Sequence, residues 1–581
     1  MMKKLCSLVF IGLLAVVLAV SCTGLRAKDL PARMDGDEFG NGAIGLKGGV
    51  SSASPLSSQI GLDILKAGGN AVDAAVATLF AVGVVEPYLS GLGGPGMMTI
   101  YIKKTNEYIM LESMGTVPAA VKPGWYNPNT DGSTAKNATV PGAVYGLLTA
   151  LEKYGTMSRD KVISPAMRLA REGFPVDKRL AEYILNNYDY ISNSHAAHIY
   201  LDADGFPYGI GDTIKNPDYA NVLEAIIKGG IKEFYTGATA EKIVASLRAG
   251  GSLIEMSDMA AYSTAVRKPI RTTYYGYEVV TVPPPSNGGD WLLELLNICE
   301  KMGIDKYKPN TPEYLYIFNE ANRIALMDSY LYIGDPAFYK LPIDQVTSKE
   351  FAAERSALLD LSKMKAMDRI PESNLPIEKI GPTATTDSGT TQVSIIDKSG
   401  NIVSATHTLG LGWGCKYSIE GMGFFVNSHV SNLNHTDPNS PDYVMPGKRV
   451  RSTISPSMVL KDGKPILAIG SPGSLAIPPA IALVINNTLL YGMDLQGAIN
   501  FPRAMAINRS TTTGPTRAMT IEAARFDPAI VDAIKGMGYT ITDVGDYDSA
   551  VGGIAAIYID QKAGVFYGGA DPRREYKALA Y

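Results

Sequence analysis

Residues 390–409 have the sequence TTQVSIIDKSGNIVSATHTL. Apolar and polar residues alternate on both sides of the segment Asp397–Asn401, which contains Gly400, so this stretch predicts a β-hairpin. The preceding residues 362–389 are polar and rich in Pro, Ser and Thr, a composition typical of an exposed loop. We therefore expect an exposed loop to end directly in a strand that begins with Thr390 and Thr391.

A break in the peptide bond between Gly389 and Thr390 would give this strand a chemical role. Thr390 would then carry both a hydroxyl nucleophile and a free α-amine. Because an α-amino group titrates at about pH 8, it can accept the hydroxyl proton close to neutral pH. One residue would supply nucleophile and base together. The structural alternative is a plain Thr-Thr pair at a strand start, where β-branched residues are common.

Helical and strand segments alternate along the rest of the chain. Apolar spacing predicts a helical region over 51–82 that is broken at Gly68-Gly69, and two strands over 97–112 around a turn at 103–106. Residues 270–283 have a strand-like pattern, while Ser158 and Thr311 are candidate N-caps of two helices in between. This order predicts a layered α/β fold.

The composition limits the class of protein. The chain has 581 residues, of which 46% are apolar and 19% charged, so a disordered or polytopic membrane protein is excluded. The formal net charge of −4 gives no basic field that would attract phosphates, so we expect no nucleic-acid partner.

The first 22 residues, MMKKLCSLVFIGLLAVVLAVSC, predict a secretory signal, because two lysines precede a short apolar run and small residues. The end of this segment resembles a bacterial lipobox in which Cys22 becomes the lipidated first residue. The alternative is ordinary cleavage near Arg26-Ala27. In either case we expect an exported protein, periplasmic or at the cell surface, with a lipid anchor if Cys22 is modified.

Three other features predict no cofactor. Cys6 would leave with the signal, and Cys299 and Cys415 could form a disulfide or remain two buried thiols. His195 and His198 have no third ligand nearby in sequence, so we expect no metal site. Residues 91–96 match GxGxxG, but a strand pattern follows instead of a helix, which indicates a tight turn and not a dinucleotide site.

Nine motifs spread over more than 500 residues carry a resemblance to a known family. They are, in chain order, ILKAGGNAVDAAVA, SGLGGPGMM, VPGAVYGL, KYGTMSRDKVISPAMRLAREGFPV, PPPSNGG, YIGDP, TTQVSIIDKSGNIVSATHTL, STISPSMVLKDGKPILAIGSPGS and YGGADPR. From about residue 45 to its carboxyl terminus, the chain resembles the gamma-glutamyltransferase (gamma-glutamyltranspeptidase, glutathione hydrolase) family. The resemblance implies an N-terminal-nucleophile hydrolase with a four-layer αββα sandwich. It also implies autocatalytic cleavage between Gly389 and Thr390 into a large subunit, 23–389, and a small catalytic subunit, 390–581, which remain together.

The resemblance also assigns the catalytic machinery. Thr390 would attack a γ-acyl carbonyl, and Thr408 matches the family threonine that hydrogen-bonds the nucleophile. The backbone N–H groups of Gly473 and Ser474 match the oxyanion hole, a type of contact that contributes about 3 kcal/mol in the transition state. Ser452 and Thr453 match the serine pair near the substrate carboxylate. For these motifs the alternative is structural, with GSPGS a strand-end turn and STISP a bend.

The chain departs from the family at the substrate-binding positions. Glu112 in MLESM stands where an arginine of a DFREMAP-like stretch holds the glutamyl α-carboxylate. His429 and Asn432 in NSHVSNL replace the Gln and Asp that bind the α-amino group, Gly410 replaces an Asn, and Gln392 replaces a His. We expect Glu112 to repel a substrate carboxylate, which loses several kcal/mol of charge-assisted binding. Arg449 or Arg451 could bind that carboxylate instead, or could be ordinary surface cations.

Three functions remain open on the sequence. The first is an exported, self-cleaving enzyme that transfers or hydrolyses γ-glutamyl groups of glutathione-like compounds, with water, an amino acid or a peptide as acceptor. The second is a related acylase with a different acyl group. The third is a catalytically silent surface protein that keeps the fold as a binding scaffold.

Overall fold

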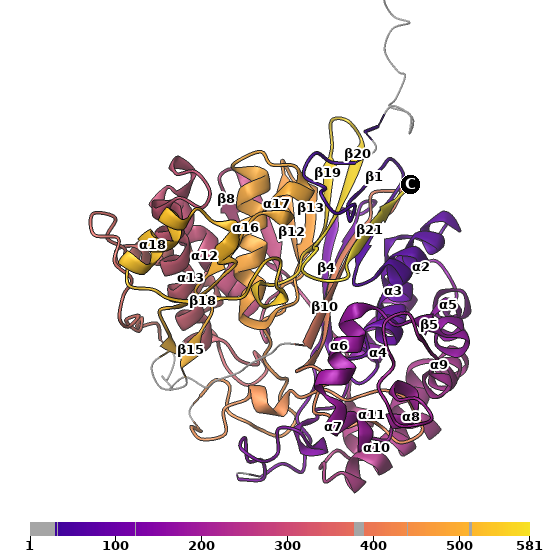
Figure 1. Cartoon of the computed structure of the whole chain (residues 1–581). Coiled ribbons are helices and arrows are strands. Elements are labelled where there is room, and N and C mark those ends of the chain that lie inside the picture. Colours follow the sequence, from indigo (N-terminus) through magenta and orange to yellow (C-terminus); the bar gives the residue numbers. More distant parts are fainter. Residues whose placement is uncertain (1–29, 32, 123, 377–388, 439, 511–513) are drawn as a thin grey trace, which may run out of the picture.

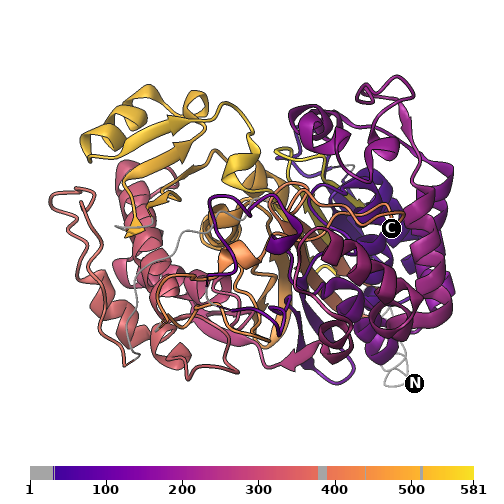
Figure 2. The same ribbon diagram turned by 90° about the horizontal axis from the view of Figure 1, so that it is seen from below.

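The computed structural model describes residues 30–31, 33–122, 124–376, 389–438, 440–510 and 514–581. Two seven-stranded antiparallel sheets lie face to face at its centre, and helices cover the outer side of each sheet (Figure 1). The view from below shows the two helical layers on opposite sides of the molecule (Figure 2). The predicted four-layer αββα sandwich is confirmed. The predicted signal segment and Cys22 lie outside the described residues.

The first sheet combines strands from both ends of the chain. Its order is β1 (Ala43–Gly45), β20 (Val565–Ala570), β19 (Ala555–Asp560), β13 (Lys464–Gly470), β12 (Ser457–Lys461), β9 (Tyr277–Thr281) and β8 (Ile270–Tyr274).

The second sheet has the predicted hairpin at its centre. Its order is β21 (Lys577–Ala580), β2 (Gly49–Ser52), β10 (Gly389–Ile396), β11 (Ile402–Gly410), β3 (Gly96–Ile102), β4 (Glu107–Ser113) and β7 (Ala265–Arg267). In the turn, the Asp397 carboxylate accepts hydrogen bonds from the backbone N–H groups of Ser399 and Asn401, at 2.8 and 3.0 Å. Gly400 has φ +83°, a conformation that favours glycine. The hairpin prediction is confirmed.

The helices next to the second sheet come from the first half of the chain. They are α2 (Pro55–Lys66), α3 (Ala71–Val85), α4 (Ala143–Tyr154), α5 (Arg159–Glu172), α6 (Lys178–Asn186), α7 (Tyr188–Ser192), α8 (Ala197–Tyr200), α9 (Pro217–Thr236), α10 (Ala238–Ala249) and α11 (Met256–Ala261). All 15 residues of α3 are buried, because α3 packs on β10 and β11 and is covered by α2, α4 and α5. Its sequence is apolar apart from Asp73 and Thr78 and has no polar face, which fits this central position.

The helices next to the first sheet are α12 (Gly288–Met302), α13 (Pro312–Tyr332), α14 (Ile343–Val346), α15 (Lys349–Ser356), α16 (Ile477–Leu489), α17 (Leu495–Asn500) and α18 (Pro528–Gly536). Short strands complete the fold: β5 (Phe174–Pro175) with β6 (Thr213–Ile214), β14 (Ala504–Met505) with β17 (Ala518–Ile521) and β18 (Thr540–Asp543), and β15 (Arg509–Ser510) with β16 (Gly514–Pro515).

The two sheets are joined by side-chain hydrogen bonds from the hairpin. The Ser394 hydroxyl donates to the Ala555 carbonyl at 2.9 Å, and the Ser404 hydroxyl donates to the Ile469 carbonyl at 3.0 Å. Apolar side chains such as Ile396 fill the rest of the space between the sheets. The hairpin is therefore fixed on both faces, by α3 on one side and by the first sheet on the other.

Several local predictions need correction. Residues 270–283 form two strands, β8 and β9, because Tyr275 and Gly276 make a turn with positive φ. Residues 51–52 belong to strand β2, and the first helix begins only at Pro55, although the break at Gly68-Gly69 is confirmed. Ser158 accepts a hydrogen bond from the Lys161 N–H as predicted.

Thr311 is the N-cap residue of α13, but its hydroxyl makes no capping bond and donates to the Lys308 carbonyl.

Candidate active site

Thr390 is the second residue of β10, and it lies opposite Thr408 of β11 in the centre of the second sheet. Both side chains are fully buried. The Thr390 hydroxyl donates to Thr408 Oγ1 at 3.1 Å, and the Gly410 backbone N–H donates to the same Oγ1 at 2.8 Å. An irregularity in strand pairing falls between Gly389 and Thr390. The structure thus brings the predicted nucleophile and its predicted partner into direct contact.

Gln392 fixes the strand that carries Thr390. Its Oε1 accepts from the Thr406 hydroxyl at 2.6 Å, and its Nε2 donates to Ser404 Oγ at 3.0 Å. Gly470, at the end of β13, faces this side chain, and a Cβ there would lie 2.2 Å from Gln392 Oε1. A Cβ at Gly470 would therefore require the end of the Gln392 side chain to move.

The loop after β13 presents backbone donors. Gly473 has φ +126° and Ser474 has φ +55°, and a Cβ at Gly473 would lie 2.8 Å from the Gly552 Cα. Ser474 begins the 3-10 turn η5 (Ser474–Ala476), which leads directly into α16. The Thr453 hydroxyl donates to the Ser474 carbonyl at 3.0 Å and so fixes this loop. N–H groups at the start of a helix stabilise negative charge, which suits an oxyanion hole.

The residues that match the acyl-binding positions converge from three loops. Gly410 has φ +89°, and a Cβ there would lie 2.4 Å from Ser428 Oγ and 3.4 Å from His429 Cε1. Asn432 Nδ2 donates to the Arg451 carbonyl at 3.2 Å, next to Ser452. The Ser452 backbone is held in turn by the Ser286 hydroxyl, which donates to its carbonyl at 2.7 Å.

His429 is a neutral residue in this structure. It is completely buried, and burial lowers its pKa to about 3. Neither ring nitrogen has a hydrogen-bond partner among the described residues. His429 therefore cannot supply the negative charge that an ammonium group requires.

The expectation that Glu112 repels a substrate carboxylate is wrong in its physical basis. Glu112 is fully buried, and its Oε2 accepts from Arg267 Nε and Nη2 at 3.1 and 2.9 Å. Its Oε1 accepts from Arg449 Nη1 at 3.1 Å and from the Met114 N–H at 2.6 Å. Two guanidinium groups thus compensate the single carboxylate, so Glu112 acts as an internal anchor.

Both arginines proposed as replacement cations already have a carboxylate partner. Arg449 is bound to Glu112 and also donates to the Ser263 carbonyl at 2.6 Å. Arg451 is buried, forms an ion pair with Asp442 at 3.2 Å and lies 4.1 Å from the centre of the Tyr330 ring. The alternative interpretation, that they are ordinary surface cations, is also wrong, because both side chains are bound inside the protein.

Sequence reasoning missed three residues beside the nucleophile. Glu86, the residue after α3, is buried; burial raises its pKa to about 7 despite the opposing effects of Arg574 and a hydrogen bond with the Thr391 side chain. Tyr576 accepts from the Gln392 backbone N–H at 3.1 Å. The available signals were an acid directly after a mostly apolar helix and Arg574, the arginine that directly follows YGGADPR.

A cavity of about 380 Å³ adjoins the candidate oxyanion loop. Gly473 and Ser474 form part of its wall, and Arg179 and Arg574 lie on another part. It contains none of the residues that match the acyl-binding positions.

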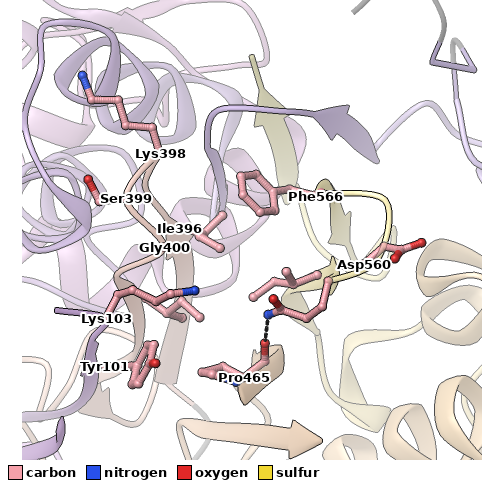
Figure 3. Close-up of a pocket in the computed structure, with 13 residues that line it drawn as sticks. Tyr101, Lys103, Ile396, Lys398, Ser399, Gly400, Pro465, Asp560 and Phe566 are labelled. Atoms are coloured by element: carbon pink, nitrogen blue, oxygen red, sulfur yellow. Dashed lines mark hydrogen bonds between the residues drawn. The ribbon is translucent and has the colours of Figure 1, made fainter. Parts of the chain in front are cut away.

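A second cavity, of about 200 Å³, lies at the far end of β10 (Figure 3). Ile396 and Phe566 line it together with Lys103 and Lys398. Ile396 is six residues from Thr390, which corresponds to about 20 Å along a strand. This cavity has no part in the candidate active site.

Other predicted features have plain structural roles. Gly93 lies in a tight turn, as expected, and a Cβ there would lie 2.2 Å from the Phe425 carbonyl oxygen. Cys299 and Cys415 are buried free thiols, so they do not form the disulfide that the sequence left open. His198 pairs with Asp218 at 3.0 Å. Within the described ranges, no cluster of three or more His, Cys, Asp or Glu residues could hold a metal ion, and no helix is both long and apolar enough to cross a membrane.

Comparisons with known proteins agree on one family. The family model described as Gamma-glutamyltranspeptidase matches residues 57–581. The glutathione hydrolase proenzyme of Bacillus subtilis (strain 168) is 31% identical over 597 residues, with 100% of this chain and 99% of that protein covered. The Acylase ACY 1 proenzyme of Pseudomonas sp. (strain SE83) is 33% identical over 474 residues, with 79% and 83% covered.

A solved structure has the same fold along nearly its whole length. The crystal structure of cephalosporin acylase from Bacillus halodurans matches with a TM-score of 0.83 and 27% sequence identity, covering 97% of this chain and 99% of that chain. Glutathione hydrolases and acylases thus both resemble this chain over most of its length.

Proposed function

The chain belongs to the gamma-glutamyltranspeptidase family of enzymes, and we propose that it cleaves itself between Gly389 and Thr390 and then transfers or hydrolyses the acyl group of an amide through a threonyl ester. The observation that carries this proposal is the 3.1 Å hydrogen bond between the buried hydroxyls of Thr390 and Thr408, at the start of a central strand. A threonine at this place needs only a free α-amine to become nucleophile and base.

In the proposed reaction, Thr390 Oγ1 attacks the amide carbonyl while the Thr390 α-amine takes its proton. The backbone N–H groups of Gly473 and Ser474 stabilise the oxyanion that forms. The carbon–nitrogen bond then breaks, and the leaving amine receives the proton from the α-amine. Water or a second amine attacks the ester, and the released hydroxyl is Thr390 again.

Self-cleavage is tested first. Intact-mass analysis of the purified protein should show a fragment of about 20 kDa whose first residue is Thr390. Thr390→Ala should remain one uncut chain without acyl turnover, whereas the matched variant Thr391→Ala should still be cut. An uncut, inactive wild-type protein would contradict this proposal and support the scaffold function.

The acyl group is the second question. The relatives include glutathione hydrolases, so a γ-glutamyl amide is the first candidate substrate. A second candidate, an acyl group without the α-amino and α-carboxyl groups, is favoured by the neutral His429 and by the closed ion pairs of Glu112, Arg449 and Arg451. An ammonium bound there would have no carboxylate opposite it at the positions that match the family's Gln and Asp.

We therefore expect a glutaryl anilide to be hydrolysed faster than the corresponding γ-glutamyl anilide. The measurement is kcat/KM for the two anilides with the same cleaved enzyme. A clear preference for the γ-glutamyl compound would establish the glutathione-hydrolase specificity and contradict this interpretation of the acyl-binding residues.

The signal sequence and the lipobox-like segment ending at Cys22 support export and lipid anchoring as part of the proposal. A cell fractionation with and without Cys22→Ser, followed by detergent phase partitioning, tests both.

A further inference from the structure

Arg451 connects the acyl-binding positions to the interior of the protein. It is the residue before Ser452, and its backbone carbonyl accepts from Asn432 Nδ2 at 3.2 Å. Its side chain is 2% exposed, and its guanidinium carbon lies 4.1 Å from the centre of the Tyr330 ring of α13. The main chain of Arg451 therefore holds Asn432 and continues into Ser452, whereas its guanidinium group lies among buried side chains.

Two carboxyl groups face this guanidinium group. Asp442 Oδ2 lies 3.2 Å from Arg451 Nη2, an ion pair that lacks the geometry of a hydrogen bond. Asp290, in the first turn of α12, is completely buried and interacts electrostatically with Arg451. Neither oxygen of Asp290 has a hydrogen-bond partner in the part of the chain that the structure describes. Arg451 therefore has one carboxylate in contact and a second, unpartnered carboxyl group nearby.

The two carboxyl groups differ in the number of cations that act on them. Asp442 interacts with Arg451, Lys448 and Arg509, whereas the cation that acts on Asp290 is Arg451. Burial raises the pKa of both carboxyl groups, and it raises the pKa of Asp290 well above its usual range. Near neutral pH, Asp442 is therefore the ionised partner of Arg451, and Asp290 keeps its proton.

The other charged groups around Asp290 are already occupied. One turn further along α12, Glu294 is also buried, and burial and the neighbouring Asp328 raise its pKa well above the usual range. Asp328 on α13 accepts from Arg355 Nε at 2.7 Å, so that cation has its own partner. The first backbone N–H groups of α12 oppose the raised pKa of Asp290, but they make no hydrogen bond to its oxygens. An ionised Asp290 would therefore depend on Arg451 for compensation.

The turn of α12 that carries Asp290 is attached to the acyl-binding segment. Asn287, the N-cap residue of α12, donates its backbone N–H to the Ser452 carbonyl at 2.9 Å. Gly288 packs so closely that a Cβ there would lie 2.0 Å from the Thr453 carbonyl oxygen. A displacement at Asp290 would therefore be passed to Ser452 and Thr453 through direct contacts.

We propose that Arg451 is a positioning residue for acyl binding whose guanidinium group changes partner with pH, from Asp442 near neutral pH to Asp290 in alkaline solution. Paired with Asp442, Arg451 holds Asn432 and Ser452 as they lie in this structure. Loss of the Asp290 proton creates a second buried carboxylate that attracts Arg451, because an uncompensated buried charge is strongly unfavourable. The Arg451 backbone then shifts, and the acyl group binds more weakly. This inference rests on the proposed acyl transfer and adds its regulation by pH.

The test is the pH dependence of KM for the better of the glutaryl and γ-glutamyl anilides, measured with the cleaved enzyme from about pH 6 to about pH 10. KM of the wild type should rise about 5- to 100-fold over this range, the usual size of a coupling between two states. Asp290→Asn cannot ionise at this position, so its KM should stay at the wild-type value found at the acid end. The Thr390 α-amine titrates in the same range, but it affects both proteins alike.

Asp442→Asn is the reverse test. It removes the partner that Arg451 has near neutral pH, so KM should already be raised there by about 5- to 100-fold, while kcat stays within about 3-fold. Glu294→Gln is the matched control, because it replaces a buried acid of the same helix that faces Asp328 instead of Arg451. It should keep the wild-type profile of KM against pH.

A crystal structure of Asp442→Asn adds a readout without turnover, because it should show the Arg451 guanidinium group in contact with Asp290. Identical KM profiles of the wild type and Asp290→Asn, or an unmoved Arg451 in Asp442→Asn, would overturn this inference while leaving the proposed reaction intact. A cleaved enzyme that turns over neither anilide would instead overturn the proposed reaction, and the structure of Asp442→Asn would still decide which carboxylate Arg451 binds.

Discussion

Replacing Glu112 with Gln should destabilise the protein by about 3 kcal/mol, the lower end of what removing one partner of a buried ion pair costs. Glu112 is completely buried, whereas the side chains of Arg267 and Arg449 are 22% and 14% exposed. Three guanidinium hydrogen bonds end on the carboxylate, and each bond to a charged group contributes about 1.5–3 kcal/mol. The sum overstates the loss, because Gln can still accept and water reaches the arginines.

Urea unfolding of the wild type and Glu112→Gln gives the difference in free energy of unfolding. The matched control is Glu278→Gln, which breaks the exposed pair between Arg271 and Glu278, with side chains 50% and 31% exposed. We expect that control to lose less than about 1 kcal/mol. Equal losses in the two variants would refute the conclusion that Glu112 is an anchor.

Glu112→Arg, which restores the family's arginine, extends the same test. It would place three guanidinium groups together in a buried site, so we expect a larger loss of stability than in Glu112→Gln and no gain in affinity for γ-glutamyl substrates. A stable variant with improved γ-glutamyl binding would show that the substrate carboxylate reaches this position after all.

Two further predictions concern the residues around the nucleophile. Thr408→Val removes the acceptor of the Thr390 hydroxyl, 3.1 Å away, so acyl turnover should fall about 10- to 100-fold while Thr408→Ser stays within a few-fold; equal activity of the two variants would argue against this contact. The pKa of Glu86 is raised by burial from 4.5 to about 7, so the folded state binds the proton more tightly than the unfolded state. The resulting stability is present below about pH 4.5 and is lost as the pH rises through 7, by roughly 3 kcal/mol in all. Denaturation curves of Glu86→Gln at pH 5 and 9 should lack this loss. A variant with the same pH dependence of stability as the wild type would contradict the raised pKa of Glu86.

The central hairpin could be predicted because the residues that specify its strands and turn are adjacent in sequence. Alternation on both sides of Asp397–Asn401 specifies two strands and a turn, and β10 and β11 form with Thr390 opposite Thr408. The same local reasoning missed the turn at Tyr275-Gly276, because Tyr275 adopts a positive φ that its residue type does not indicate.

The charge partners of the site could not be predicted in this way. Glu112 and Arg449 are 337 residues apart in sequence, and the bridge between Thr116, just after β4, and Arg449 brings the two segments together. Similarly, Glu86 and Arg574 come from opposite ends of the chain, and their proximity depends on β10 packing against α3. The residue type at position 112 indicates a departure from the family. That Arg267 and Arg449 compensate the charge of Glu112 can be seen only in the structure.

The order of strands has a consequence for a chain that is cut before Thr390. Both sheets are interleaved, since β10 pairs with β2, β11 with β3, β21 with β2, β12 with β9 and β1 with β20, each pair joining one strand from either side of the cut. The two products could separate only if all of these strand pairs broke. Their exposed strand edges would then be prone to aggregation. The cut would therefore break one peptide bond and leave the strand pairs between the two parts intact, so the two subunits would remain associated. Expressing the two parts as separate chains would require all of these strand pairs to form between two molecules.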